Sequence, residues 1–314
     1  MILPILSTPV VQPSNQVMVS SIEEIHENSI GLPIVDLSEH LRMMDLVFED
    51  GMEETLLLRR ESQGIADEVE RMMEPRSGVI TLLVGRGHNG ANAIEAGNFL
   101  LRKGYTVQAR LMVPLTECDP LSQELAISFL NSGGTLEEFH EQPFAPGLII
   151  DGLVGTAFKG VARGTLKQMI LAANASRQPI LAIDVPSGLN AETGEGDIAI
   201  QATRTATMGF AKFGFFLNQG PEKVGQLSVV DLGLSERVMS QVVARAYLMS
   251  RYEGENYHSP SDEILTLQQV EALIGRHADF QNIQEFVDRE ERSLIMKDSQ
   301  MIIFRPNEKP IICL

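Results

Sequence analysis

The chain has 314 residues, of which 44% are hydrophobic, and its formal net charge at pH 7 is −17. That length and hydrophobic content suffice for one large α/β domain, alone or with an appendage. The strongly acidic balance argues against non-specific binding to nucleic acid or to an anionic membrane, although a local cradle of N–H groups can still hold a small anionic ligand.

The chain carries few signs of export or membrane insertion. Its two cysteines, Cys118 and Cys313, allow at most one disulfide, which fits a reducing compartment. The first residues lack a basic segment and are interrupted by Pro4 and Pro9, so we expect no signal peptide. No apolar run reaches the roughly 18 residues that a membrane-spanning helix needs. We therefore expect a cytoplasmic protein.

The N-terminal part of the chain predicts an arm followed by helices. Residues 1–19 contain three prolines and no periodicity, which favours an extended arm. Ser21 and Glu24 have the spacing of a capping box for a short helix. Further helices are expected over 37–48 and 53–73, and apolar residues at helical spacing in the latter indicate packing on a sheet.

A buried strand, a glycine turn and a helix follow over 79–103. The β-branched run 79–84 is typical of a buried parallel strand. Gly85, Gly87 and Gly90 then have the spacing of the dinucleotide-binding fingerprint. The acidic residue that binds ribose in that fingerprint is absent near 109–111, so an ordinary nicotinamide dehydrogenase is disfavoured. A tight turn without a ligand is the plain structural alternative.

Strands and helices alternate along the next 130 residues. Asp119 and Pro120 predict the start of a helix that runs to Asn131, and a second helix is expected over 164–175. The alternation predicts an α/β fold with a doubly wound, mostly parallel, Rossmann-like sheet. The remaining strands are expected over 106–113, 135–139, 147–151, 179–184, 203–207 and 226–231.

Residues 251–314 differ in character and predict a small α+β appendage of unknown role. Thr266 and Gln269 form a capping-box pattern for a helix that Gly275 ends, and a second helix is expected over about 280–291. Short strands are expected over 293–297, 301–305 and 310–313. We therefore divide the chain into a Rossmann-type domain over 1–250, with its arm and helices, and an appendage over 251–314.

Three turns of the predicted sheet carry Gly together with Asp, Asn or Ser. They cover 85–93, 151–160 and 184–189, and each follows a strand. Ligands of doubly wound sheets bind beyond the carboxyl ends of the strands. We therefore expect the three turns to share one site.

The same segments resemble the YjeF N-terminal domain of the NAD(P)H-hydrate epimerase family, over about 50–235. Asp184-Val185-Pro186-Ser187-Gly188-Leu189-Asn190 is the most specific match. The resemblance implies an isomerase that interconverts the R and S epimers of NADH or NADPH hydrated at C6. It also implies a homodimer and one potassium ion per subunit. The dehydratase domain often fused to this family does not fit in the residues after 235, so a separate dehydratase partner is expected. The other matching segments are 85–90, 150–156, 205–212 and 225–233.

The resemblance also implies roles for individual residues. Asn89, Asp151 and Ser187 match the side-chain ligands of the potassium ion, and oxygen ligands suit such a hard cation. Asp184 matches a substrate contact and is the expected acid/base, with Lys212 placed near the phosphates or the ring. The expected substrate-binding segments are His88, Asn89, Gly90, Ala91 and Asn92, and then Gly155, Thr156, Ala157, Phe158, Lys159, Gly160 and Val161.

Several positions depart from the family pattern and keep other interpretations open. His88 replaces an Asn, and Ala91-Asn92-Ala93 replaces Gly-Asp-Gly. The family's Met-Glu-x-Ala-Gly helix motif, expected near 58–62, is not matched there. A catalytically degenerate family member that binds a nucleotide or serves as a scaffold is therefore the alternative, and an unrelated phosphosugar- or nucleotide-binding module is a third. Asp151 and Asp184 can also be read as turn-capping residues, and Lys212 as a solvated charge.

Overall fold

The computed structural model describes residues 33–73, 77–249, 263–275, 280–297 and 301–313. The arm over 1–19 and the short helix expected after Ser21 lie outside these residues. Within them the strands form two sheets of seven strands each.

One sheet is parallel throughout and is doubly wound, as the alternation of strands and helices predicts. From β2 the chain moves outward through β3 to β4, then returns to the other side of β2 with β5 and continues to β9. The direction of winding therefore reverses between β2 and β5, which is where such folds open a ligand crevice. The strands in spatial order are β4 (Thr135–Glu138), β3 (Val107–Leu111), β2 (Val79–Val84), β5 (Gly147–Gly152), β6 (Ile180–Ile183), β7 (Arg204–Met208) and β9 (Gln226–Val230).

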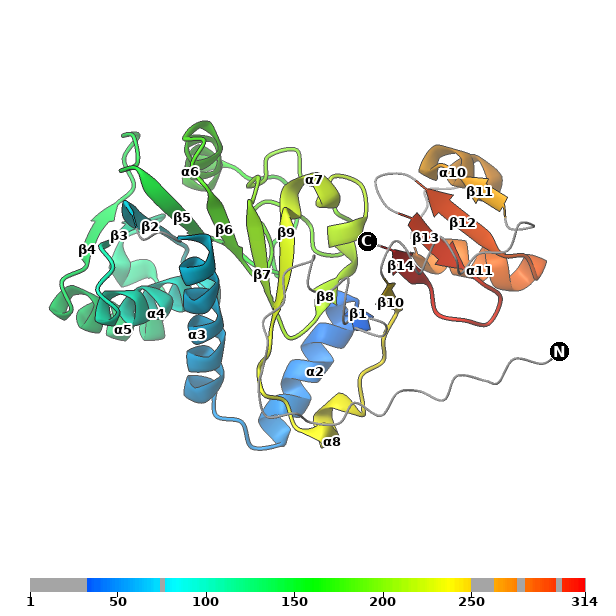
Figure 1. Ribbon diagram of the computed structural model, residues 1–314, viewed down its shortest axis with the longest axis horizontal. Helices are drawn as coiled ribbons and strands as arrows, with labels where there is room; N and C mark the ends of the chain where they lie inside the picture. Colours follow the sequence, from blue (N-terminus) through cyan, green and yellow to red (C-terminus); the bar gives the residue numbers. More distant parts are fainter. Residues whose placement is uncertain (1–32, 74–76, 250–262, 276–279, 298–300, 314) are drawn as a thin grey trace.

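Helices cover both faces of this sheet (Figure 1). Successive residues of a strand point to opposite faces, so Leu82 and Val84 share a core with one set of helices while Leu83 packs with Met169 of α6 on the other side. The helix expected over 53–73 is α3, and its apolar stripe joins the first core as predicted. The first set is α3 (Glu54–Met72), α4 (His88–Arg102) and α5 (Pro120–Asn131), and the opposite face carries α6 (Gly164–Ala175).

The second sheet is mixed and contains strands from the N-terminal and C-terminal parts of the described chain. Its strands β10, β1 and β8 belong to the region before residue 250, and β14 pairs with β10. The appendage strands β11 to β14 therefore extend a sheet that starts beside the parallel one, and the boundary at residue 250 stays a prediction. In spatial order the strands are β11 (Glu263–Leu265), β12 (Leu294–Lys297), β13 (Met301–Phe304), β14 (Ile311–Cys313), β10 (Ala246–Met249), β1 (Pro33–Val35) and β8 (Ala211–Lys212).

The helices beside the second sheet largely follow the sequence patterns. Thr266 and Gln269 form the expected capping box, and Gly275 ends the helix in the left-handed conformation. Phe213, Phe215 and Phe216 are buried, in a short 3-10 helix that sequence periodicity does not reveal. These elements are α2 (Leu37–Glu49), α10 (Leu267–Ile274), α11 (Phe280–Glu290), η2 (Phe213–Phe216), α7 (Gly220–Val224) and α8 (Glu236–Met239), with η1 (Leu115–Glu117) before α5.

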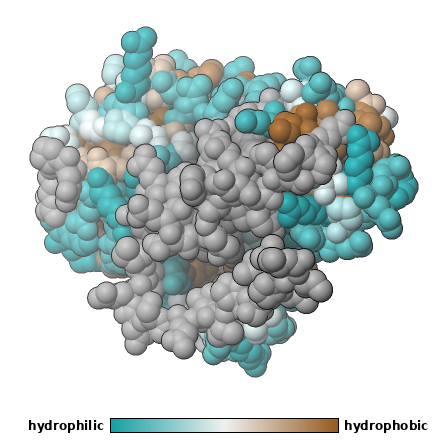
Figure 2. Space-filling view, turned by 45° about the vertical axis from the view of Figure 1, so that its right-hand side comes forward, coloured by the Kyte–Doolittle hydropathy of each residue, from teal (hydrophilic) through white to brown (hydrophobic). Residues whose placement is uncertain are grey.

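Most of the described surface visible in Figure 2 is hydrophilic. Over the described ranges, no helix combines the length and the apolar character needed to cross a bilayer.

Close backbone contacts fix the turn between β2 and α4. A Cβ on Gly85 would lie 1.7 Å from the carbonyl oxygen of Leu153, and a Cβ on Gly90 would lie 2.1 Å from that of Gly85. Neither approach is possible for a side-chain carbon, so both positions require glycine. Gly87 differs, because nothing lies within 4 Å of the Cβ it would carry.

We expect Gly90→Ala to lower the free energy of unfolding by about 3 kcal/mol, because the added methyl group meets rigid backbone. Gly87→Ala, the control in the same turn, should cost less than about 1 kcal/mol. Urea unfolding of the two variants measures the difference. Equal losses would contradict the close packing of the turn.

Candidate active site

The three turns singled out in the sequence meet at the carboxyl ends of β2, β5 and β6. The Gly85 N–H donates to the carbonyl oxygen of Gly152 over 3.0 Å, which joins the first turn to the second. The Asn89 amide donates to the carbonyl oxygen of Ile183 over 3.0 Å, which joins the first turn to the third. Parallel neighbouring strands make this convergence possible, because their carboxyl ends lie at one edge.

Asp151 and Ser187 form the buried centre of this edge. The Ser187 hydroxyl donates to Oδ1 of Asp151 over 2.6 Å, and the Ser187 N–H donates to Oδ2 over 2.8 Å. Asp151 is the second-to-last residue of β5 and has no exposed surface. Burial raises the pKa of Asp151 to about 6, and the hydrogen bonds from Ser187 and Leu153 oppose that rise.

Asn89 lies against the same cluster. A Cβ on Gly155 would sit 2.8 Å from Oδ1 of Asn89, so the glycine leaves room for this amide. The Asn89 Nδ2 donates to the carbonyl oxygen of Ile183, and Oδ1 is the acceptor atom of the same amide. The expected potassium ligands Asn89, Asp151 and Ser187 are thus brought together by three different turns.

The donor chemistry of this cluster fits a hard monovalent cation. It offers a carboxylate, a hydroxyl and an amide oxygen, and the hydrogen-bond donors to Asp151, from Leu153 and Ser187, are neutral. Within the described part of the chain, no group of three or more His, Cys, Asp or Glu side chains is arranged to hold a metal ion. The side chains around Asp151 therefore suit potassium better than a transition metal.

Asp184 and Lys212 form a buried ion pair beside this cluster. The Lys212 Nζ lies 2.6 Å from Oδ1 of Asp184, and it also donates to the Thr207 hydroxyl over 2.7 Å and to the Met208 carbonyl oxygen over 3.2 Å. The three N–H bonds of the ammonium group are matched by three acceptors. Lys212 is 1% exposed, so it is not the solvated charge considered from the sequence.

The backbone at Asp184, the carboxylate of this pair, is strained. Asp184 has φ 65°, a left-handed conformation that costs about 1 kcal/mol or more for a residue with a side chain. Burial by itself raises the pKa of Asp184, but the charges of Lys212 and His40 and the hydrogen bonds from Lys212 and the Met208 N–H together outweigh it and hold that pKa below 3.8. The carboxylate is therefore ionised at neutral pH and fixed in direction.

A histidine from the N-terminal region stands close to the pair. His40 of α2 is 7% exposed, and its Nδ1 has no hydrogen-bond partner among the described residues. Burial, aided by the charge of Lys212, lowers the pKa of His40 to about 4. His40 is thus a neutral imidazole at neutral pH, and sequence patterns did not single it out.

The segment His88–Asn92 forms the first turn of α4, and part of it faces inward. Ala91 and Asn92 are 0% and 1% exposed, whereas the His88 side chain is 46% exposed. Only His88 and part of Asn89 therefore present side chains to a ligand from this turn. Substrate contact through Ala91 and Asn92 stays a prediction.

Glu61 of α3 is the main site residue that the sequence reasoning missed. Its Oε2 lies 2.8 Å from Nε2 of His88 and 2.9 Å from Nδ2 of Asn92. The hydrogen bond with Glu61 raises the pKa of His88 above 6.5, against the effect of burial, and the charges of Glu54 and Asp184 add to the rise.

A shift of register explains why Glu61 was missed. The family motif Met-Glu-x-Ala-Gly was placed near 58–62, but residues 60–64 keep its Glu and its Gly as Glu61 and Gly64. A Cβ on Gly64 would lie 2.4 Å from Cγ1 of Val230 on β9, so α3 needs glycine to pack on the sheet. The motif is therefore partly present, two residues later than expected.

The loop after β5 continues the edge outward. The Phe158 N–H donates to the Gly155 carbonyl oxygen over 3.0 Å, which folds the first half of the loop. The second half, around Lys159 and Val161, is exposed. A hollow beside it is lined by Gly160, Val161, Gly188, Asn190, Asp197 and Gln219, among others.

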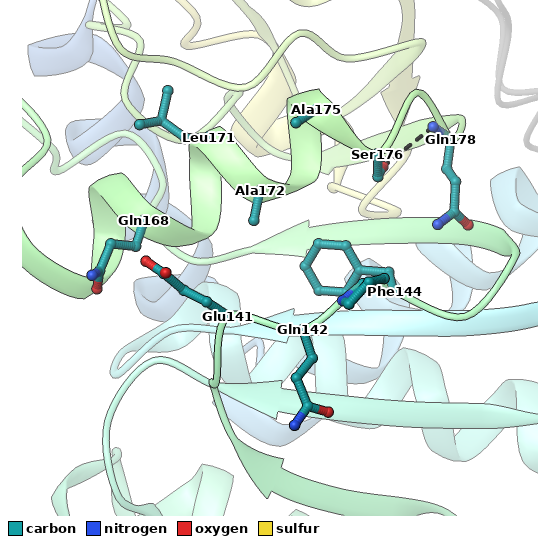
Figure 3. Close-up of a pocket in the computed structure, with 10 residues that line it drawn as sticks. Glu141, Gln142, Phe144, Gln168, Leu171, Ala172, Ala175, Ser176 and Gln178 are labelled. Atoms are coloured by element: carbon teal, nitrogen blue, oxygen red, sulfur yellow. Dashed lines mark hydrogen bonds between the residues drawn. The ribbon is translucent and has the colours of Figure 1, made fainter.

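Another pocket lies at the opposite end of the strands (Figure 3). Its walls come from the segment that leads into β5, from α6 and from the segment that leads into β6. Phe144, Leu171 and Ala172 line it together with Gln142 and Gln168. It contains none of the site residues expected from the sequence, so we do not assign it to the site.

Comparisons with known proteins identify related sequences. A family model described as YjeF-related protein N-terminus matches residues 54–214. The bifunctional NAD(P)H-hydrate repair enzyme Nnr of Mycobacterium tuberculosis H37Rv is 34% identical over 184 residues, 57% of this chain and 37% of that enzyme. The NAD(P)H-hydrate epimerase of Leuconostoc mesenteroides is 30% identical over 186 residues, 59% of this chain and 83% of the epimerase.

A solved structure supports the fold. The crystal structure of yeast ynu0, YNL200c, has a TM-score of 0.55 and 16% identity, and covers 63% of this chain and 87% of its own. Fold and site together define a Rossmann-like α/β protein with a polar site at the topological switch of its sheet. The chain belongs to the family of YjeF-related protein N-termini. It spans little more than a third of the bifunctional relatives that it matches.

Lys212→Met should lower the free energy of unfolding at pH 7 by about 3 kcal/mol, because it leaves the Asp184 carboxylate buried without its cation. The Asp184 pKa is lowered in the folded protein, so the pair stabilises the wild type above pH 3.8 and this contribution is lost as the pH falls through the folded pKa.

The pH dependence of stability should be the opposite in the Lys212→Met variant. Without Lys212, burial raises the pKa of Asp184. As the pH falls, protonation of Asp184 removes the unpaired buried charge and so reduces the destabilisation of the variant. Urea unfolding at pH 7, 5 and 4 should therefore show a gap between the two proteins that narrows toward acid. A gap that stays constant or widens would contradict the pairing.

Proposed function

We propose that this chain is an NAD(P)H-hydrate epimerase, which interconverts the R and S epimers of C6-hydrated NADH and NADPH. The observation that carries the proposal is the ionised, strained Asp184, held by Lys212 at the edge where the three turns meet. The names of relatives that share 27% to 34% of aligned residues support it, two of them stand-alone epimerases matched over 83% and 93% of their length.

The chemistry needs one well-placed carboxylate. The ring nitrogen of the hydrated nicotinamide expels the C6 hydroxyl as the C–O bond breaks. The hydroxyl takes up a proton from solvent and leaves as water, and an iminium cation remains. A water molecule then adds to C6 from the other face and gives up a proton. The lowered pKa keeps Asp184 ionised at neutral pH and its direction is fixed, so it is suited to stabilise the cationic ring. The same carboxylate accepts the proton that the water gives up.

Lys212 acts through Asp184 in this proposal. All three of its donors are engaged within the protein, so its role is to keep the carboxylate ionised and oriented. The proposed positioning role replaces the direct contact with the phosphates or the ring that was expected from the sequence. The Lys212→Met variant tests the ion pair on which this role depends.

We further propose a potassium ion, one per subunit, held by Asn89, Asp151 and Ser187. A cation there would balance the buried Asp151 carboxylate and hold the three turns together. The segments at 88–92 and 155–161 would then form the two walls that receive the dinucleotide.

The cellular setting is also part of the proposal. We place the chain in the cytoplasm as a homodimer, acting beside a separate dehydratase that consumes one epimer. The name of the mycobacterial relative, a bifunctional repair enzyme, supports the pairing of two repair activities.

Asp184→Asn should lower the rate of epimerisation roughly a hundredfold or more, because the amide neither accepts the proton nor carries the charge. The assay starts from pure R-hydrate and follows the S-hydrate by chromatography. Asp231→Asn is the matched control, because Asp231 also follows a parallel strand but is exposed, and it should keep wild-type turnover.

Wild-type turnover in Asp184→Asn would remove Asp184 from the mechanism. If the wild type itself produces no S-hydrate but binds NADP, the degenerate nucleotide-binding member becomes the better description of this chain.

Potassium should raise the melting temperature. At a concentration tenfold above its dissociation constant, binding to the folded state alone adds about 1.4 kcal/mol. The measurement compares KCl with tetramethylammonium chloride at equal ionic strength, in the wild type and in Asp151→Asn. The gain should vanish in the variant, and an equal Tm for the wild type in both salts would rule out the ion.

A further inference from the structure

Glu61 is a hydrogen-bond acceptor that two residues in the first turn of α4 share. One carboxylate oxygen, Oε2, receives His88 Nε2 at 2.8 Å and Asn92 Nδ2 at 2.9 Å. Glu61 is 4% exposed and comes from α3, a different helix. A carboxylate only accepts hydrogen bonds, so both neighbours must donate to it.

Asn92 is held at both ends of its amide group. Its Nδ2 donates to Glu61, and its Oδ1 accepts from the Ser62 hydroxyl at 3.1 Å. Asn92 and Ser62 are 1% and 0% exposed. An amide can donate and accept at once, whereas an ionised Asp can only accept. The neighbouring residues on α3 therefore use both the donor and the acceptor of the Asn92 amide.

The two polar departures from the family loop are thus linked. His88 and Asn92 both donate to Glu61, although they lie 27 and 31 residues from it along the chain. An Asp at 92 would remove the donor to Glu61 and place two carboxylates within about 3 Å of each other in a buried place, where their like charges repel. His88 and Asn92 are therefore tied to α3 by the same acceptor.

We infer that Glu61 is a positioning residue of the active site, which sets the glycine turn by accepting hydrogen bonds from His88 and Asn92. The His88 side chain remains 46% exposed, and Asn89, between the two anchored residues, donates to the carbonyl oxygen of Ile183. The effect on turnover rests on the proposed epimerase function. The linkage of Glu61 with Asn92 does not, because it shows in stability alone.

A double-mutant cycle tests the linkage. Asn92→Asp should lower stability, because it removes the donor to Glu61 and adds a like charge. In Glu61→Gln/Asn92→Asp the new amide can donate to the new carboxylate. We expect the double variant to be at least about tenfold more stable, as a ratio of unfolding constants in urea, than the sum of the single effects predicts.

Asn98→Asp is the matched control. Asn98 lies on the same helix, is fully buried, and donates to Glu95 over 3.0 Å and to the Leu125 carbonyl oxygen. It repeats the same chemical change away from the glycine turn. It should also lower stability, but Glu61→Gln should not rescue it.

Turnover separates positioning from a purely structural role. Well below their melting temperatures, Asn92→Asp should lose about tenfold or more in kcat with a smaller change in KM, and the double variant should regain it. Asn98→Asp should keep kcat despite its lost stability. Equal kcat losses in Asn92→Asp and Asn98→Asp would overturn the positioning role.

The experiments still decide the inference if Asn92→Asp does not fold or if the wild type has no epimerase activity. If Asn92→Asp does not fold, recovery of folded protein in the double variant supports the inference, and failure of the double variant to fold overturns it. Additive stability effects overturn it as well. Without epimerase activity in the wild type the proposed function falls, and the stability cycle still decides whether Glu61 sets the turn.

Discussion

The site depends on one steric constraint, the contact between the glycine turn after β2 and the backbone that follows β5. Gly85 donates to Gly152 across the switch point of the sheet, and no side chain fits on Gly85 or Gly90. This contact brings the start of α4 against Asp151 and lets Asn89 reach the carbonyl group of Ile183. The remaining polar geometry follows from that approach.

Two buried carboxylates at this edge have different surroundings and therefore different properties. Asp151 is surrounded by neutral donors, and burial raises its pKa to about 6. Asp184 has Lys212 as its partner, and its pKa lies below 3.8. The first is suited to hold a cation and the second to remain an anion facing a developing positive charge. This division of roles is the physical basis of the epimerase proposal.

Local patterns were enough to predict the parallel sheet, its helices and the convergence of its three turns. Strand and helix periodicity is a local property, and parallel topology places strand ends at one edge. The strands β1, β8 and β10 were missed because each is two to four residues long and exists through distant pairing. Asp184 and Lys212 were expected at the site as two separate residues, but not as one ion pair.

The sequence by itself determined the fold class, the family resemblance and the presence of Asn89, Asp151, Asp184 and Ser187 on turns, because these are written in contiguous motifs. Only the tertiary structure decided that Lys212 holds Asp184, and that Glu61 anchors His88 and Asn92. Those partners lie 27 to 31 residues apart. Hydrogen bonds between such distant residues depend on how helices pack on the sheet, which no local pattern specifies.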